Sequence, residues 1–161
     1  METKKILFVC LGNICRSPSA EIVMQTLIEK QGLSKQFELD SAGIIDNHEG
    51  QMADSRMREH ALKRGLHITH RSRLIHAKTD FEYFDMIIGM DDDNMEALNQ
   101  LARLPEWKNK LYRMTDFRKE MAYTYVPDPY YGEAKGFELV LDILDDACKG
   151  LIEKIMNYEQ L

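Results

Sequence analysis

The stretch K-K-I-L-F-V-C-L-G-N-I-C-R-S-P-S-A-E, residues 4–21, joins an apolar run to a helical pattern. Lys4 to Val9 suits a buried strand, and from Ser17 to Lys30 apolar residues recur at helical spacing. The loop between them contains Gly12 and Asn13, the residue types that best tolerate unusual backbone angles. The sequence therefore predicts a strand, a short loop and a helix, which together form a βα unit.

The rest of the chain repeats this alternation of strands and helices. Further strands are expected at 37–41, 86–90 and, more weakly, 110–114, and further helices at 54–64, after the acidic cluster 91–93, and along the apolar stripe from Phe137 to Ile155. Thr79 or Asp80 is a candidate cap for a short helix, and residues 68–75 are ambiguous. Such alternation predicts a doubly wound α/β fold whose parallel sheet is covered by helices on both faces.

The length, charge and composition of the chain limit its possible functions. With 161 residues, the chain is expected to form a single domain over residues 1–161. The net charge of −6 and a pI near 5.4 argue against nucleic acid as a partner. The N-terminal residues lack the apolar region of a signal peptide, and no run approaches membrane-spanning length. We therefore expect a cytoplasmic protein that has no membrane partner.

Cys10 follows the first strand directly, where ligands bind in open α/β sheets. The backbone N–H groups of the loop and the start of the next helix form a cradle for an anion, and the same cradle favours the thiolate of Cys10. Arg16 can hold two phosphoryl oxygens with its planar fork, and Ser17 can donate a hydrogen bond to the thiolate. The C-x5-R spacing in this context predicts a phosphate loop with a cysteine nucleophile.

Other interpretations of these cysteines stay open from the residues alone. Cys10 could be a buried structural residue, and Cys10 with Cys15 could bind a metal, although the paired ligands that zinc usually needs are missing. A thiol redox protein is disfavoured because the spacing is not C-x-x-C. A non-catalytic phosphate-binding module would need no nucleophile. Cys148 lies in the apolar stripe of the last helix and is expected in the core.

Several motifs together resemble one known family. They are C-L-G-N-I-C-R-S-P-S-A-E at 10–21, S-A-G at 41–43, D-x-R at 54–56, H-R-S-R at 70–73, F-D-M-I-I-G-M-D at 84–91 and D-P-Y-Y-G at 128–132. In this order they resemble the low-molecular-weight protein tyrosine phosphatases along the whole chain. The resemblance implies a four-stranded parallel sheet in the order 2-1-3-4. It also implies hydrolysis of phosphotyrosine and small aryl phosphates.

The resemblance assigns roles to individual residues. Cys10 is the implied nucleophile that forms a phosphocysteine, Arg16 stabilises the phosphoryl group, and Asp128, stiffened by its flanking prolines, is the implied general acid and base. The implied substrate-binding residues are Leu11, Gly12, Asn13, Ile14, Cys15, Ser17, Asn47, Tyr130 and Tyr131. Asn13, Ser17, Ser41 and His70 form the implied supporting network. No cofactor and no metal are expected, and the expected partners are phosphotyrosine-containing proteins and oxyanions.

Further expectations concern specificity and regulation. Tyr130 and Tyr131 are expected to wall the cleft, and Ile14 is the tyrosine-type residue where related arginine phosphatases carry Thr. Asn47 stands where many members have an aromatic residue, so the opposite wall is expected to be more open or polar. Cys15 is a candidate trap for oxidised Cys10. Related arsenate reductases use cysteines near the middle of the chain, and none occurs between Ala20 and Ala147.

The acidic cluster Asp91 to Asp93 is interpreted as a helix-start feature, because carboxylates stabilise the first turn of a helix. We expect no direct role in chemistry for it.

Overall fold

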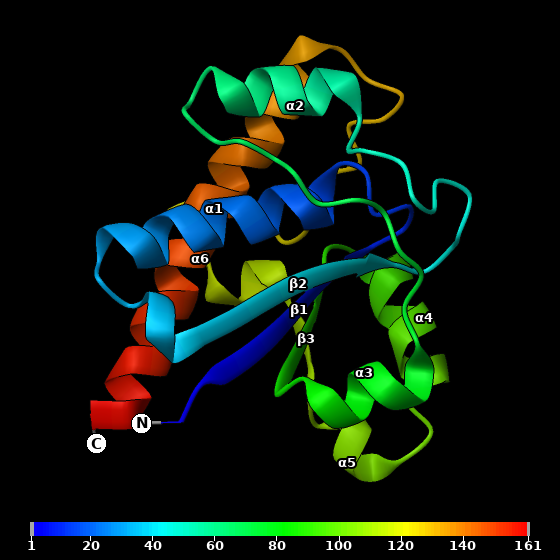
Figure 1. Ribbon diagram of the computed structural model, residues 1–161, viewed down its shortest axis with the longest axis vertical. Helices are drawn as coiled ribbons and strands as arrows, with labels where there is room; N and C mark the ends of the chain where they lie inside the picture. Colours follow the sequence, from blue (N-terminus) through cyan, green and yellow to red (C-terminus); the bar gives the residue numbers. More distant parts are fainter. Residues whose placement is uncertain (1, 161) are drawn as a thin grey trace.

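A computed structural model describes residues 2–160 and places four parallel strands at the centre of the molecule (Figure 1). The strands are β1 (Lys4–Cys10), β2 (Phe37–Gly43), β3 (Met86–Gly89) and β4 (Leu111–Arg113), and they lie in the order β2-β1-β3-β4. The predicted α/β class, the four parallel strands and their order are confirmed.

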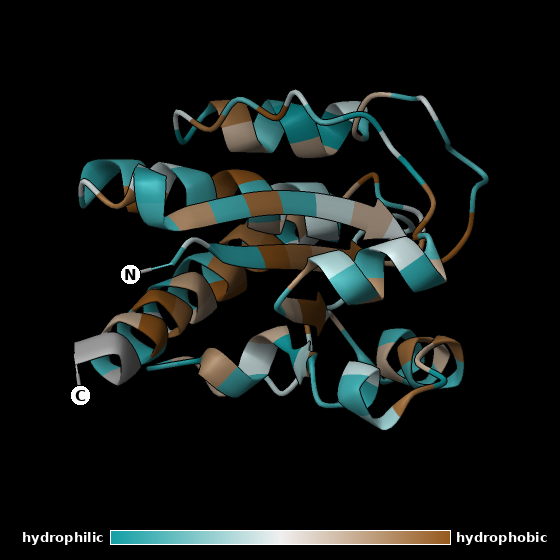
Figure 2. Ribbon diagram, turned by 60° about the horizontal axis from the view of Figure 1, so that its bottom comes forward, coloured by the Kyte–Doolittle hydropathy of each residue, from teal (hydrophilic) through white to brown (hydrophobic). Residues whose placement is uncertain are grey.

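Helices cover both faces of this sheet because the buried residues of β1 alternate between them. Ile6 and Phe8 pack into the core formed with α1 (Arg16–Lys30) and α6 (Ala134–Gln160). Leu7 and Val9 pack into a second core with α3 (Ala77–Tyr83) and α4 (Asp92–Leu101). Figure 2 shows hydrophobic residues concentrated in the strands and along the helix that ends at the C-terminus.

The remaining elements are short. Helix α2 (Ser55–Leu62) packs on the core of α1 and α6 through Met57 and Ala61. A one-turn helix, α5 (Pro105–Lys108), and two 3₁₀ turns, η1 (Ser34–Gln36) and η2 (Met114–Phe117), had no counterpart among the expected elements. They occupy three or four residues each, too few for a periodic pattern to emerge.

The start of α3 and the segment 68–75 differ from, or add to, what the sequence predicted. The expected cap at Thr79 or Asp80 is wrong, because α3 begins at Ala77 with His76 as its N-cap. The Asp80 carboxylate instead accepts a hydrogen bond from the backbone N–H of His76 and pairs with Arg73. The ambiguous residues 68–75 form an extended segment, joined to the rest by isolated bridges at Leu74 and Arg71.

The end of β2 lies directly against the loop that follows β1. Cys10 pairs with Gly43 in the sheet register, and the backbone N–H groups of Ile44 and Ile45 both donate to the carbonyl of Leu11. A Cβ atom at Gly43 would lie 3.0 Å from that carbonyl oxygen, so a larger residue would push the two segments apart. The S-A-G motif therefore allows the end of β2 to pack directly against the loop that follows β1.

No helix within residues 2–160 combines the length and apolar character needed to cross a membrane.

Candidate active site

Cys10 is the last residue of β1, and its side chain is 3% exposed at the entrance to the loop 11–15. Its Sγ atom lies 3.0 Å from Ser17 Oγ, and the backbone N–H of Ser17 points to the same sulfur at 3.4 Å. Hydrogen-bond donors and the first turn of α1 together stabilise negative charge on this sulfur. The predicted contact between Ser17 and the Cys10 thiol is present.

Asn13 shapes the loop, and it is the only non-glycine residue with a positive φ, 57°, in the described part of the chain. Its Nδ2 donates to Ser17 Oγ at 2.7 Å and to Ser41 Oγ at 3.1 Å. Its Oδ1 accepts from His70 Nε2 at 2.8 Å and from the backbone N–H of Arg73 at 3.0 Å. Four hydrogen bonds therefore stabilise a backbone conformation that costs about 1–2 kcal/mol for an L-residue.

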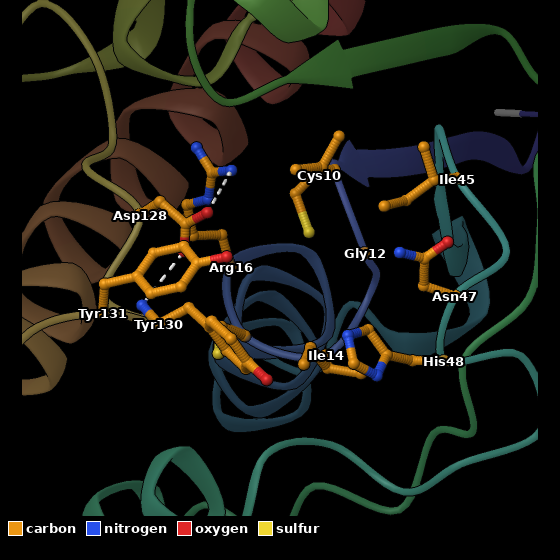
Figure 3. A pocket seen from close by; sticks show the side chains of 12 residues that line it. Cys10, Gly12, Ile14, Arg16, Ile45, Asn47, His48, Asp128, Tyr130 and Tyr131 are labelled. Carbon is orange, nitrogen blue, oxygen red and sulfur yellow. Dashed lines mark hydrogen bonds and ion pairs between the residues drawn. The ribbon is translucent and has the colours of Figure 1, made fainter.

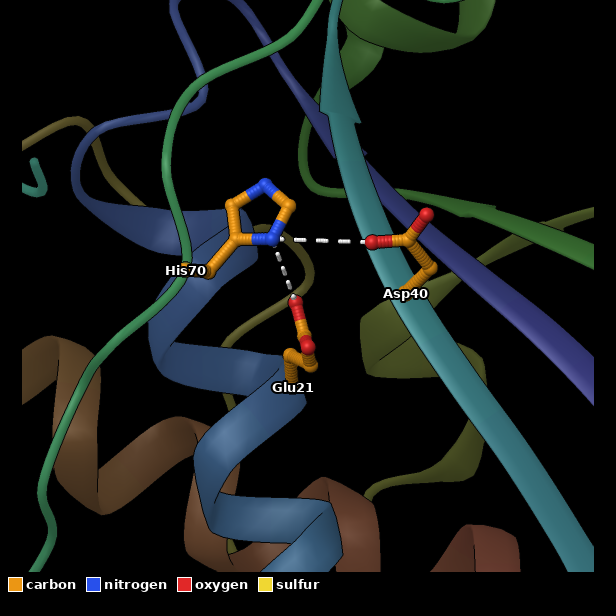
Figure 4. Close-up of side chains that lie close together, drawn as sticks. All are labelled: Glu21, Asp40 and His70. Atoms are coloured by element: carbon orange, nitrogen blue, oxygen red, sulfur yellow. Dashed lines mark ion pairs between the residues drawn. The ribbon is translucent and has the colours of Figure 1, made fainter. Parts of the chain in front are cut away.

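A second layer of polar side chains lies behind this network (Figure 4). Ser41 donates to Glu21 Oε1 at 2.7 Å, and His70 Nδ1 lies 3.4 Å from Glu21 and 3.5 Å from Asp40. Burial raises the pKa of Glu21 to about 7, although the hydrogen bond from Ser41 lowers it. Glu21, Asp40 and His70 each offer a potential ligand atom within 4.8 Å of the others, but Ser41 already bonds both carboxylates. We therefore assign this cluster to support of the loop.

Arg16 is 2% exposed and turns its guanidinium toward two carboxylates. Nη1 donates to Asp91 Oδ2 at 2.5 Å and to the carbonyl of Val126 at 3.1 Å, and Nη2 lies 3.5 Å from Asp128 Oδ2. Burial lowers the pKa of Arg16, but the charges of Cys10, Asp91 and Asp128 outweigh burial and raise that pKa above its ordinary value. A buried arginine with these partners stays charged.

Asp91 contacts the site through Arg16, which was not predicted from the sequence. It does begin a helix as expected, because its Oδ1 accepts from the backbone N–H of Asn94 at the start of α4. Its Oδ2 pairs with Arg16, so the interpretation as a helix-start feature alone is incomplete. The sequence did contain a basis for predicting this pair. Arg16 follows β1 and Asp91 follows β3, and the carboxyl ends of neighbouring parallel strands meet at one edge of a sheet.

Asp128 lies on an irregular segment that precedes α6. Its Oδ1 accepts a hydrogen bond from the backbone N–H of Tyr130 at 3.1 Å, and a turn closes from Gly132 back to the carbonyl of Pro129. The rings of Tyr130 and Tyr131 meet edge to face, 4.9 Å apart, and Tyr131 is 92% exposed. These contacts place a carboxylate and two aromatic rings at the rim above Arg16.

These segments enclose a cavity of about 100 Å³ (Figure 3). Its lining includes ten of the predicted site residues, namely Cys10, Leu11, Gly12, Ile14, Cys15, Arg16, Asn47, Asp128, Tyr130 and Tyr131. Two predicted substrate-binding residues, Asn13 and Ser17, do not line it, because their side chains are buried behind the loop. The cavity lining therefore gives no support to a role of these two side chains in substrate binding.

Two lining residues, Ile45 and His48, were not predicted. The His48 ring covers Gly12, where an added Cβ would lie 3.2 Å from Cδ2, and it faces Tyr130 across 6.0 Å. Figure 3 shows Asn47 and His48 on the side of the cavity opposite Asp128 and Tyr131. The predicted place of Asn47 at the cavity wall is thus observed, and a histidine stands beside it.

The other two cysteines are both buried free thiols. Cys15 is 3% exposed, and burial raises the pKa of its thiol strongly, with the nearby Asp54 acting in the same direction. It is therefore a neutral thiol in the lining of the cavity, and its capture of oxidised Cys10 stays a prediction. Cys148 is fully buried in α6, in agreement with the expected core position.

Comparison with known proteins places this arrangement in a family. Residues 5–161 match the family described as low molecular weight phosphotyrosine protein phosphatase. A putative low molecular weight protein-tyrosine-phosphatase of Synechocystis is 43% identical, and the match covers 94% of this chain and 96% of that protein. The low molecular weight phosphotyrosine protein phosphatase 1 of Drosophila melanogaster is also 43% identical, over 94% of this chain and 96% of its own length.

Solved structures agree with these sequence matches. The protein tyrosine phosphatase of Entamoeba histolytica superposes with a TM-score of 0.94 at 46% identity, over 98% of this chain and 99% of that one. Vibrio vulnificus Wzb, solved in complex with benzylphosphonate, gives 0.80 at 30% identity, over 94% and 98% of the two chains. This chain belongs to the low molecular weight phosphotyrosine protein phosphatase family.

Proposed function

We propose that this protein hydrolyses phosphotyrosine in other proteins, and small aryl phosphates, through a phosphocysteine formed on Cys10. The observation that carries the proposal is that one cavity of about 100 Å³ is lined by Cys10, Arg16 and Asp128 together. A thiol, a permanent cation and a carboxylate at one small cavity are the groups that transfer of a phosphoryl group to cysteine requires.

The reaction has two steps. In the first, the Cys10 thiolate attacks phosphorus while Asp128 gives its proton to the departing phenolate oxygen, so that the S–P bond forms and the P–O bond breaks. In the second, Asp128 takes a proton from water, which attacks phosphorus and releases inorganic phosphate and the Cys10 thiolate. Arg16 and the backbone N–H groups of the loop stabilise the charge on the phosphoryl oxygens in both steps.

The cavity walls support an aryl ester as the substrate. Ile14 and Ile45 are apolar, and Tyr130 and Tyr131 add aromatic faces beside Asp128. A planar ring can pack among such residues, whereas the side chain of phosphoserine offers little apolar surface to them. The benzylphosphonate in Vibrio vulnificus Wzb, a related protein, combines an aromatic group with an oxyanion in the same way.

We propose the cytoplasm as the compartment, because all three cysteines are free thiols.

Turnover of para-nitrophenyl phosphate tests this proposal. Cys10→Ser should abolish activity, and Asp128→Ala should reduce it about 10²- to 10⁴-fold because general acid catalysis is lost. Cys148→Ala is the matched control, since it removes a thiol from the core of α6 and should retain activity. Activity that survives Cys10→Ser would exclude this mechanism, and a tyrosine-phosphorylated peptide should be cleaved in preference to its phosphoserine counterpart.

A further inference from the structure

One motif has no part in the chemistry described so far, the D-x-R of Asp54 and Arg56 at the start of α2. The Arg56 guanidinium reaches out of the helix and donates from Nη2 to the backbone carbonyl of Tyr130 at 2.8 Å. We propose that Arg56 is a positioning residue for Asp128, because it fixes the backbone of the segment that carries this carboxylate. The inference rests on the proposed function, in which Asp128 is the general acid.

Two arginines form hydrogen bonds to the backbone on either side of Asp128. The carbonyl of Val126, two positions before Asp128, accepts from Arg16 Nη1 at 3.1 Å. The carbonyl of Tyr130, two positions after it, accepts from Arg56. Between these points the Asp128 side chain is held by the N–H of Tyr130 at 3.1 Å and lies 3.5 Å from Arg16 Nη2. Loss of Arg56 would therefore free the half of the segment that holds Asp128 Oδ1.

Arg56 is itself held rigidly on the side of the phosphate loop. Its Nε and Nη2 donate to the two oxygens of Asp54 at 3.2 and 3.0 Å, and the backbone N–H of Asp54 donates to the carbonyl of Ile14 at 2.8 Å. Its guanidinium also lies over the rings of Phe137, at 4.8 Å, and Tyr130, at 5.7 Å. A continuous series of hydrogen bonds thus runs from the loop beside Cys10 to the segment of Asp128.

Such a connection matters because proton transfer depends on distance. A general acid must come within hydrogen-bond reach, about 2.6–3.2 Å, of the oxygen that it protonates. Asp128 is exposed, with 36% of its side chain accessible, so the packing around it does not hold it in place. The planar guanidinium of Arg56 binds Asp54 through Nε and Nη2, and Nη2 also binds the carbonyl of Tyr130. A lysine at this position would keep the positive charge but could not reproduce this geometry.

The role predicts a kinetic signature that a purely structural residue would not produce. A phenolate with a high pKa needs protonation as it leaves, whereas 2,4-dinitrophenolate leaves readily without it. Displacement of the acid should therefore slow phenyl phosphate far more than 2,4-dinitrophenyl phosphate. A general loss of folded enzyme would reduce kcat/KM for both esters by the same factor.

The experiment compares Arg56→Ala and Arg56→Lys with wild type on both esters. We expect Arg56→Ala to lower kcat/KM about 10-fold or more for phenyl phosphate and less than about 3-fold for 2,4-dinitrophenyl phosphate. Arg56→Lys should show the same selectivity, and it serves in place of Arg56→Ala if that variant does not fold. In an Asp128→Asn background, Arg56→Ala should have little further effect, since the acid is already absent.

Arg64→Ala is the matched control, because Arg64 also links the α2 region to α6, through Glu138, without touching the Asp128 segment. It should change both esters equally. Equal losses for the two esters in the Arg56 variants, or an undiminished effect of Arg56→Ala in the Asp128→Asn background, would overturn the inference. Failure of the wild type to cleave either ester would instead overturn the proposed function.

Discussion

Arg16 and Asp91, 75 positions apart in the chain, form an ion pair of 2.5 Å between Nη1 and Oδ2. The second oxygen of Asp91 caps α4 by accepting from the backbone N–H of Asn94 at 2.8 Å. One carboxylate therefore fixes a helix and orients the guanidinium beside Cys10. Its two oxygens make the two roles separable by mutation.

Asp91→Asn should separate these roles, because asparagine caps helices about as well as aspartate but carries no charge. We expect kcat/KM for para-nitrophenyl phosphate to fall about 10-fold or more, since complete loss of one well-aimed donor in such a site costs about 2.7–4 kcal/mol and a misoriented Arg16 loses part of this. Asp92→Asn is the control, because that carboxylate is 84% exposed and pairs with Arg113 instead. Equal activities of the two variants would show that Asp91 does not orient Arg16.

Substitution of Asn13 should reveal how far the loop depends on side-chain hydrogen bonds. Asn13→Gly tolerates the φ of 57° but removes four hydrogen bonds, whereas Asn13→Ala removes the same bonds and adds backbone strain. Asn13→Ala should therefore unfold more easily than Asn13→Gly, by about 1 kcal/mol in urea titrations. Both variants should lose activity, and wild-type turnover by Asn13→Gly would contradict the proposed importance of the network.

Asn47→Trp should convert the polar side of the cavity into an aromatic wall opposite Tyr131. Stacking against the substrate ring is worth about 0.5–1.5 kcal/mol, so KM for aryl phosphates should fall about 2- to 10-fold. Inorganic phosphate has no ring, and its inhibition constant should stay the same, which makes it an internal control. An unchanged KM would show that Asn47 does not contact the bound ring.

Asp54 should make the stability of α2 depend on pH. Burial raises the pKa of Asp54, but hydrogen bonds from the Arg56 side chain and from two backbone N–H groups outweigh it and lower that pKa. A carboxyl group with a lowered folded-state pKa stabilises the protein above its unfolded-state pKa of about 3.9, and this stabilisation is lost as the pH falls through the lower value.

Asp54→Asn should consequently be less stable than wild type by about 1 kcal/mol at neutral pH, and the difference should shrink as the pH falls below about 3.9 toward pH 2. Urea unfolding at several pH values measures it, with Asp46→Asn, at an exposed loop position, as the control. A difference that stays constant down to this pH would mean that ionisation of Asp54 contributes nothing to folding.

Local pattern accounts for what could be predicted of the fold. Strand β1, its loop and helix α1 were predictable because contiguous apolar residues, a Gly-Asn pair and helical spacing each reflect the conformation of neighbouring residues. The cap of α3 was misplaced because Asp80 bonds to Arg73, seven positions earlier, and tertiary pairing overrides a local capping preference. The strand order came from resemblance to a family, since no local pattern encodes it.

The sequence by itself determined the position of Cys10 at the end of a strand, the glycine and asparagine of the following loop, and Arg16 at the start of the helix. These features depend on contacts between near neighbours, which spacing and residue type record. Only the tertiary structure decided that Asp91 faces Arg16, that His48 covers Gly12 and that Arg56 holds Tyr130. Arg56 and Tyr130 are 74 positions apart, and only the packing of α2 beside α6 brings such residues within hydrogen-bonding distance.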